Sequence, residues 1–380
     1  MAKRTNSAVW MENQKRWQIN VQKDGIRRSF TSSKAGRTGQ REANAKADAW
    51  LEDGITENVL VSVLWEDYLK SVQQSSGTSN YINTANVGKN YILPKIGHLK
   101  IEKVTENHLQ NILDEAYKHG SFAKDVPKSR KLKEGETLSR KTLKNIFTTI
   151  NAFIKYCRVR RKCTTLFPES LSIPSGARYK SKDILQADAL AILFKEDFTL
   201  YRGKRVFEQY IYAYRFMVAT GLRPGETVGL KCGDFADQEL RISRSVNVYG
   251  ETTQGKNQNA VRSFYLPPLA QEAYAKQINM LKNNGVKITP TTNVFQIEKE
   301  RHLYDAWKRY CAANNIPPIS LYEMRHTFVS ISKQLPEGTV KNLVGHSKNM
   351  DTFGIYGHQI SGEAEQTAKA VGELFEKLIK

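Results

Sequence analysis

The chain has 380 residues and carries 58 Lys and Arg against 38 Asp and Glu, a net charge of +20. That length predicts two or three domains, and the charge predicts a polyanionic partner, nucleic acid or an anionic membrane, unless the cations serve only solubility. We expect neither a membrane span nor a signal peptide, because no run approaches the roughly 20 apolar residues of a span and no apolar stretch follows the basic N-terminus.

Residues 1–55 predict a small unit of three β-strands and a helix. Trp17–Val21 and Ile26–Phe30 alternate between apolar and polar residues around an Asp-Gly pair, which is typical of a β-hairpin. After a loop at Gly36–Gly39, Arg41–Leu51 has helical composition with one apolar side, formed by Ala43, Ala47 and Trp50. Arginines on the polar face of such a sheet can enter a DNA major groove; a solvated face is the alternative.

Residues 57–170 predict a helical bundle. Val61–Val72 is apolar at helical spacing, and Thr105 can cap a helix that runs through Tyr117. Ser139 begins another helix, whose wide apolar stripe is typical of a core: Leu143, Ile146, Phe147, Ile150, Phe153 and Ile154.

A charged, turn-rich loop is expected between Lys118 and Glu136. Cations gather at the far end of the last helix, Lys155–Lys162, where they suit either the helix dipole or DNA phosphates. In the two N-terminal units, the basic residues that we expect to contact DNA are Arg27, Arg28, Lys34, Arg37, Arg41, Lys141, Lys144, Arg158, Arg160 and Arg161.

Prolines, Ser and Gly between Phe167 and Tyr179 predict a linker, which we place at 171–182. The remaining unit, 183–380, has helical patterns in Gln186–Phe194 and Gln209–Ala219.

Between Phe235 and Leu266 the pattern alternates, which predicts a small antiparallel sheet. Helices resume up to a last one at Glu363–Ile379, whose final turn is apolar. That helix can pack on its own domain or on a neighbouring protomer, and the sequence leaves both open.

Five residues whose side chains can take part in catalysis occur in this order along the last unit: Arg223, Lys256, Arg325, His346 and Tyr356. Two arginines can present planar forks of donors to phosphate oxygens. A lysine and a histidine can move protons, and a tyrosine can attack phosphorus. Singly, each has an ordinary alternative: a surface ion pair for an arginine, turn solubility for Lys256, a structural role for His346. Together they predict nucleic acid cleavage and rejoining.

The region 183–358 resembles the catalytic domain of tyrosine recombinases, the phage integrase family. The motifs that carry the resemblance are ATGLRPGE at 219–226, QGK at 254–256, YEMRHTF at 322–328, LVGHS at 343–347, and Tyr356. The middle unit resembles the core-binding domain of these enzymes. The first unit, especially RRSFTSSKAGRTGQREA at 27–43, resembles the arm-binding domains of integrases from conjugative transposons and phages.

The resemblance implies a role for each residue. Tyr356 attacks phosphorus and leaves a 3′-phosphotyrosine and a free 5′-hydroxyl, so rejoining needs no ATP. Lys256 supplies the proton to the leaving oxygen, and His346 hydrogen-bonds the scissile phosphate or assists proton transfer. Arg223 and Arg325 hold the non-bridging oxygens. No metal or other cofactor is expected, because arginines take the metal's charge role.

Supporting roles follow for two further residues. Glu226, one helical turn from Arg223, is expected to orient its guanidinium unless it serves only as a charge at a helix N-terminus. His326 is expected to brace the pocket.

Two departures from the family pattern stand out. Tyr322 occupies a phosphate-contact position where the family usually has His, and a phenol can still donate a hydrogen bond there. It is also a rival nucleophile, which we reject because its place in the motif is a phosphate-contact position and Tyr356 fits the position of the nucleophile. The other departure lies between His346 and Tyr356, where the spacing is one residue longer than the resemblance leads us to expect.

The resemblance implies an integrase of a mobile element that assembles as a homotetramer on core and arm sites in double-stranded DNA. Strand exchange would pass through a Holliday junction, with an excisionase and a host DNA-bending protein as partners. A type IB topoisomerase-like enzyme and a catalytically silent DNA-binding protein are the alternatives. Four cysteines without CxxC pairs predict reduced thiols and no zinc site, in keeping with a cytoplasmic, nucleoid-associated protein.

Overall fold

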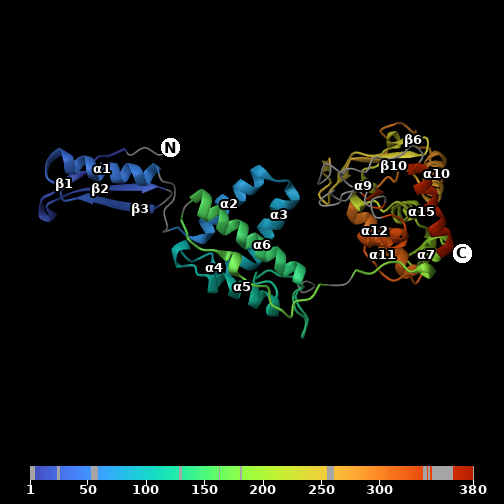
Figure 1. The fold of residues 1–380 in the computed structure, drawn as a ribbon, viewed down its shortest axis with the longest axis horizontal. Coiled ribbons are helices and arrows are strands. Elements are labelled where there is room, and N and C mark those ends of the chain that lie inside the picture. The colour runs from blue at the N-terminus through green and yellow to red at the C-terminus, as the bar shows by residue number, and fades with distance from the viewer. Residues whose placement is uncertain are drawn as a thin grey trace. The chain divides into compact units, whose positions relative to one another are not determined.

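The computed structural model describes residues 5–23, 26–52, 59–127, 131–161, 163–179, 182–254, 261–336, 340, 343–344 and 363–379. The chain divides into two units, Met1–Lys180 and Ser181–Lys380. Within the described ranges, the buried apolar residues form three clusters: one in the first β-rich segment, one in the helical segment that follows, and one in the C-terminal unit. Figure 1 labels the helices and strands of each part.

The N-terminal segment is a three-stranded antiparallel sheet with one helix on it. The strands are β1 (Val9–Met11), β2 (Arg16–Lys23) and β3 (Ile26–Ser32), in that order, and the helix is α1 (Gly36–Glu52). Lys23 pairs with Ile26, so the predicted hairpin is confirmed. Ala43, Ala47 and Trp50 are buried, as the apolar side predicted.

The expected loop at Gly36–Gly39 is wrong, because α1 already begins at Gly36. Glycine is needed here for close approach rather than for a break in the helix. A Cβ on Gly39 would lie 1.8 Å from the carbonyl oxygen of Lys34, so the helix could not follow the preceding segment this closely with a larger residue.

The helical segment forms a bundle around one core. Its elements are α2 (Val61–Ser75), α3 (Thr78–Val87), the π-helical turn η2 (Gly88–Ile92), α4 (Leu93–Ile96), the 3₁₀ turn η3 (Ile101–Lys103), α5 (Glu106–His119), α6 (Arg140–Tyr156), the π-helical turn η5 (Cys157–Arg161) and the 3₁₀ turn η6 (Pro168–Ser170). Both predicted helix starts are confirmed: the Thr105 side chain accepts from the His108 N–H at 3.3 Å, and the Ser139 side chain from the Thr142 N–H at 3.3 Å.

The proline-containing segment after α6 differs from the linker that we expected. Leu171 and Ala177 are buried in the core of the bundle. Gln110 donates to the Ser172 carbonyl at 3.0 Å and accepts from the Ser172 N–H at 3.0 Å. Apolar residues spaced among the turn-forming ones therefore fasten this segment to the bundle, and the division between the two units falls at Lys180.

The C-terminal unit combines helices with a three-stranded antiparallel sheet of order β10-β7-β6 and the two-stranded sheets β4-β5 and β8-β9. Its helices are α7 (Ala187–Lys195), α8 (Ile211–Thr220), α9 (Pro224–Val228), α10 (Pro268–Asn283), α11 (Glu300–Ala313), α12 (Leu321–Ile331) and α15 (Glu363–Ile379), with the 3₁₀ turns η7 (Cys232–Asp234) and η9 (Ser332–Gln334). Its strands are β4 (Phe198–Tyr201), β5 (Lys204–Phe207), β6 (Phe235–Ala236), β7 (Glu239–Ile242), β8 (Ser245–Val246), β9 (Thr252–Thr253) and β10 (Arg262–Tyr265).

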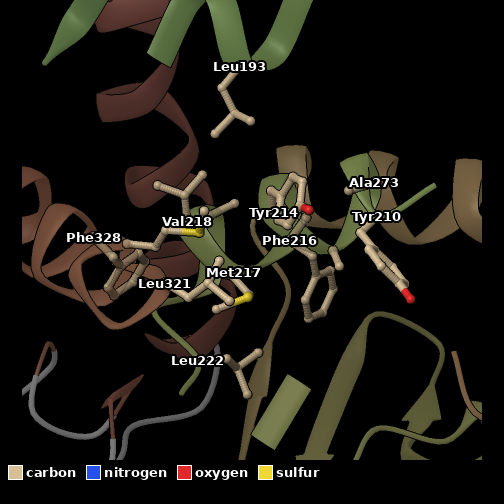
Figure 2. Packing of buried hydrophobic residues seen from close by; sticks show 14 of the residues in the cluster. Leu193, Tyr210, Tyr214, Phe216, Met217, Val218, Leu222, Ala273, Leu321 and Phe328 are labelled. Atoms are coloured by element: carbon tan, nitrogen blue, oxygen red, sulfur yellow. The ribbon is translucent and has the colours of Figure 1, made fainter. Parts of the chain in front are cut away.

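Helix α8 is the centre of this unit, since every residue from Ala213 to Thr220 is buried. Figure 2 shows Phe216, Met217 and Val218 of α8 among side chains from other elements, including Leu321 and Phe328 of α12. The hairpin β4–β5 was not predicted. Its strands are short, and its turn depends on Arg202 and Gly203 at φ 48° and 75°, which a hydrophobic pattern does not reveal.

Helix α15 has the predicted bounds, and within this single chain it packs on its own unit. Val371 and Phe375 are buried in the core of the C-terminal unit. The rings of Phe375 and Phe328 are 6.3 Å apart, and a Cβ on Gly372 would lie 2.7 Å from Pro268, so α15 lies close against α10 and α12.

Candidate active site

Arg223 is positioned by the junction between α8 and α9. Gly221 ends α8 with φ at +67°, and a Cβ there would lie 2.5 Å from the Phe328 ring, so glycine is required on both counts. Arg223 then caps α9 in extended conformation, followed by Pro224 in the first turn. The predicted turn around Arg223 is therefore a tight helix-to-helix junction.

A buried carboxylate holds Arg223. Glu226 is 3% exposed. It accepts from the Arg223 N–H at 2.9 Å and from Arg223 Nη1 at 2.8 Å. Both alternatives for this residue are thus realised together, since Glu226 caps the first turn of α9 and also orients the Arg223 guanidinium.

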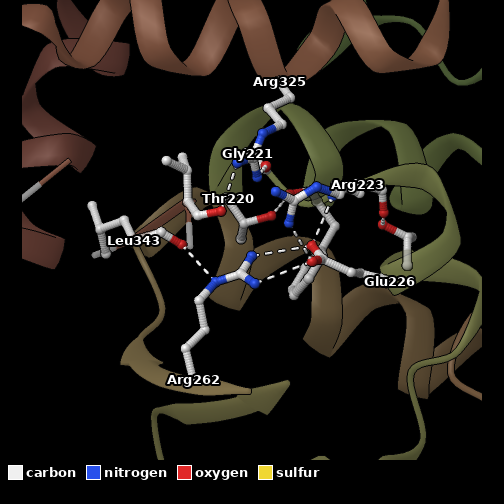
Figure 3. Close-up of polar contacts among 10 residues, drawn as sticks. Thr220, Gly221, Arg223, Glu226, Arg262, Arg325 and Leu343 are labelled. Carbon is white, nitrogen blue, oxygen red and sulfur yellow. Dashed lines mark hydrogen bonds and ion pairs between the residues drawn. The ribbon is translucent and has the colours of Figure 1, made fainter. Parts of the chain in front are cut away.

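Arg262, to which the sequence assigned no role, is the second partner of Glu226. It begins β10, and its Nη1 and Nη2 donate to the two carboxylate oxygens at 3.1 and 3.0 Å (Figure 3). Its Nε donates to the Leu343 carbonyl at 2.9 Å. Its side chain is only 8% exposed. The available signal was an arginine at the start of an apolar strand, where burial requires an acidic partner.

Arg325 lies on α12 and is 2% exposed. Its Nη1 donates to the Gly221 carbonyl at 2.9 Å and its Nη2 to the Val344 carbonyl at 2.6 Å. Burial, and then the neighbouring positive charge of Arg223, lower the pKa of Arg325 to about 10. The guanidinium therefore stays charged at neutral pH, in a place where an anion would relieve the repulsion between the two arginines.

Tyr322 and His326 lie one helical turn apart on α12. Their rings meet edge to face with centroids 5.5 Å apart. Tyr322 is 41% exposed, whereas Arg325 on the same helix is buried. The phenol is thus accessible to a large partner, and His326 lies beside it. Lys256, His346 and Tyr356 lie outside the described residues, so the structure brings together only Arg223, Arg325 and their supports.

The candidate DNA-contacting residues of the N-terminal sheet divide between its two faces. Arg28 pairs with Val21, which is buried under α1, and its guanidinium lies 5.6 Å from the Phe30 ring. Arg27 pairs with Gln22 and points to the opposite face, because neighbouring residues of a strand alternate.

Three other candidates form contacts within the protein. Lys34 pairs with Glu42 at 3.1 Å, Arg158 with Glu169 at 3.3 Å, and Arg161 with Asp67. The rest are exposed: Arg37, Arg41, Lys141, Lys144 and Arg160. Within the described ranges, no group of three or more His, Cys, Asp or Glu side chains is arranged to hold a metal ion.

Glu226 predicts an acid-sensitive contribution to stability. Burial by itself raises the pKa of this carboxyl, but the hydrogen bond and charge of Arg262 outweigh it, and the net pKa lies below the ordinary 4.5. A lowered folded-state pKa gives stability that is present above about pH 4.5 and is lost as pH falls through the folded-state pKa. The difference in free energy of unfolding between wild type and Glu226→Gln should therefore become smaller as the pH falls. Urea unfolding at several pH values, followed by hydrogen exchange of α8 peptides, measures it; a difference that widens in acid contradicts the assignment.

Comparisons with known proteins identify the family of the chain. Residues 203–362 match the phage integrase family, and residues 61–116 match the phage integrase N-terminal SAM-like domain. The chain is 22% identical to a tyrosine recombinase XerC-like protein of Caldanaerobacter subterraneus subsp. tengcongensis, over 99% of this chain and all of that one. It is 24% identical to the ICEBs1 integrase of Bacillus subtilis, over 48% of this chain and 53% of that one.

Solved structures show the same fold. The Tn1549 transposon integrase in complex with transposon right end DNA superposes with a TM-score of 0.60 at 16% identity, over 81% of this chain and 98% of that one. The lambda integrase tetramer bound to a Holliday junction gives 0.55 at 15% identity, over 93% and 96%. The fold is that of a multidomain, mainly helical integrase with small antiparallel sheets. The chain belongs to the phage integrase family and is a tyrosine recombinase.

No helix among the described residues is long and apolar enough to cross a membrane.

Proposed function

We propose that this protein integrates and excises a mobile genetic element, by cleaving and rejoining specific DNA sites through a 3′-phosphotyrosine at Tyr356. The observation that carries the proposal is the phosphate clamp, which we define as Arg223 and Arg325 with their partner Glu226. A buried carboxylate that is shared with Arg262 orients Arg223, and two backbone carbonyls orient Arg325.

The charge of this cluster suits a phosphodiester in its transition state. Arg223 and Arg262 pair with Glu226, and Arg325 lies near enough to interact with its charge, so three guanidinium groups share one carboxylate and a net positive charge remains for the non-bridging oxygens. Preorganised donors of this kind bind more strongly as negative charge develops, and one is typically worth about 3–4 kcal/mol. Because both arginines are already fixed by the protein, little reorganisation is needed when DNA binds.

The residues outside the described ranges complete the reaction in this proposal. The Tyr356 phenol attacks phosphorus, Lys256 gives a proton to the departing 5′-oxygen, and His346 hydrogen-bonds the phosphate. Tyr322, exposed on α12 near Arg325, donates to a phosphate oxygen in place of the usual imidazole. The bond energy is kept in the phosphotyrosine, so a 5′-hydroxyl can reverse the step without ATP.

The other domains supply DNA binding. We assign 57–170 to the core site and 1–55 to a separate arm site, with a homotetramer that exchanges strands through a Holliday junction. The lambda integrase tetramer bound to such a junction supports this arrangement. An excisionase and a host DNA-bending protein in the bacterial cytoplasm are the partners that arm sites require.

A nicked suicide duplex tests the proposal. The full chain should form a covalent protein–DNA adduct on a duplex that carries the element's end, without metal or ATP, and with the 3′-phosphate attached to protein. Adduct formation with any duplex, together with relaxation of supercoils that lack the site, would favour a topoisomerase-like enzyme. Binding without an adduct would favour a catalytically silent protein.

The two faces of the N-terminal sheet give a separate prediction. The face away from α1 carries only polar and charged side chains on its two longest strands in the described ranges: Arg16, Gln18, Asn20, Gln22, Arg27, Ser29 and Thr31. If this face enters the groove, Arg27→Ala should weaken arm-site binding. The slope of log K against log salt concentration should also become shallower by about one, the value of one phosphate contact. Arg28→Ala, on the α1 side, is the matched control, and fluorescence anisotropy at several salt concentrations measures both. A larger effect from Arg28→Ala contradicts the assignment of faces.

A further inference from the structure

Arg262 connects two parts of the clamp that lie far apart in the sequence. Through its fork it holds Glu226 of the first arginine box, and through Nε it holds the carbonyl of Leu343 in the third box. Arg325, from the second box, donates to the carbonyl of the very next residue, Val344. Figure 3 shows Glu226 between Arg223 and Arg262, and Arg262 joined to Leu343 as well.

The fold of the strand does not require this guanidinium. The backbone of β10 is already paired with β7, in a register that sets Arg262 opposite Ile242. Phe264 in the strand and Leu266 just after it are buried in the core of the unit, and these contacts hold β10 in place. A large charged side chain that is 8% exposed costs desolvation energy, so its contacts with Glu226 and Leu343 need another explanation than packing.

The effect of Arg262 on the charge of Glu226 explains these contacts. With Arg223 as its sole cationic partner, Glu226 would cancel the charge that Arg223 offers to DNA. With Arg262 across both carboxylate oxygens, at 3.0 and 3.1 Å, the carboxylate is already neutralised. Glu226 can then fix the direction of the Arg223 guanidinium, while a net positive charge remains for the phosphate.

We propose that Arg262 is a positioning residue of the phosphate clamp: it neutralises Glu226 so that Arg223 is oriented without losing its charge, and it holds the 343–344 backbone that Arg325 also binds. This inference rests on the proposed function, since it requires a scissile phosphate between Arg223 and Arg325. It assigns no contact between Arg262 and DNA.

The test compares Arg262→Lys and Arg262→Met in the full chain. Lysine keeps a charge beside Glu226, and so protects folding, but cannot bind both carboxylate oxygens and Leu343 together. Arg301→Met is the matched control, because it breaks an exposed Arg–carboxylate pair with Asp305 at 2.8 Å on α11. Single-turnover adduct formation is measured at saturating protein on two suicide duplexes, one with a normal scissile phosphate and one with a neutral methylphosphonate there.

On the normal duplex, both Arg262 variants should form the adduct about 10- to 100-fold more slowly, the usual cost of losing a supporting partner of an active group. Core-site Kd should change less than tenfold. The defect should shrink on the methylphosphonate, which lacks the anionic oxygen that the clamp neutralises, and Arg301→Met should react as wild type does. The inference would be overturned if the Arg262 variants formed the adduct at the wild-type rate, or if their rates fell equally on both duplexes. It would also be overturned if the fall in rate followed a change in core-site Kd or in the thermal midpoint of unfolding. If wild type itself forms no adduct, the proposed function fails instead.

Discussion

Replacing Tyr356 by Phe should abolish the covalent adduct on a nicked suicide duplex while leaving core-site binding intact. In the proposed mechanism the phenol oxygen attacks phosphorus, and phenylalanine has the same ring without it. A tyrosine has a pKa near 10 in water, so attack at neutral pH needs the positive field that Arg223 and Arg325 provide. Denaturing electrophoresis of the labelled strand measures the adduct, and anisotropy measures binding.

Tyr322→Phe is the decisive companion variant. Its phenol is 41% exposed and lies three residues before buried Arg325, so it is accessible to DNA. We expect this variant to keep forming the adduct at a reduced rate, because it loses one hydrogen bond to the phosphate. An adduct that survives Tyr356→Phe and disappears with Tyr322→Phe would transfer the nucleophile to α12.

Glu226→Ala should lower the free energy of unfolding of the C-terminal unit by about 3–5 kcal/mol, the cost of removing one partner from a buried ion pair. Glu226 is 3% exposed and accepts from two arginines and from the N–H that begins α9. Without it, the Arg223 and Arg262 guanidinium groups lose their shared anionic partner and repel each other. Urea unfolding followed by hydrogen exchange of α8 peptides measures the change.

Two variants control this experiment. Glu226→Gln keeps the volume and one acceptor, so its cost should be smaller, about 1–3 kcal/mol. Asp305→Ala removes an exposed pair with Arg301 and should cost far less than Glu226→Ala, because solvent screens that pair. Equal costs for Glu226→Ala and Asp305→Ala would show that the Glu226 cluster does not stabilise the fold.

Local patterns predicted most helices well, because each one follows from a cap and an apolar stripe. Thr105 and Ser139 cap α5 and α6 as expected, and α15 has the bounds that its pattern indicated. The errors have tertiary causes. Gly39 is typical of a loop but lies within α1, where close approach to Lys34 excludes a side chain.

The site was predictable only where chemistry and motif coincide. Arg223, Glu226 and Arg325 were singled out from the sequence, and the structure gives them a common place. Arg262 was missed because its function comes from two contacts, Glu226 36 residues away and Leu343 81 residues away, which no local spacing encodes.

The attachment of Leu171 and Ala177 to the helical bundle limits how such integrases can exchange parts. A chimera could join the DNA-binding half of one protein to the catalytic half of another within the proline-containing segment 167–179. Its helical bundle would then have a core built from residues of two different proteins. A junction at Lys180–Ser181 leaves both halves whole. Chimeras with new target sites, natural or engineered, should therefore have their crossover after the last buried alanine of the bundle.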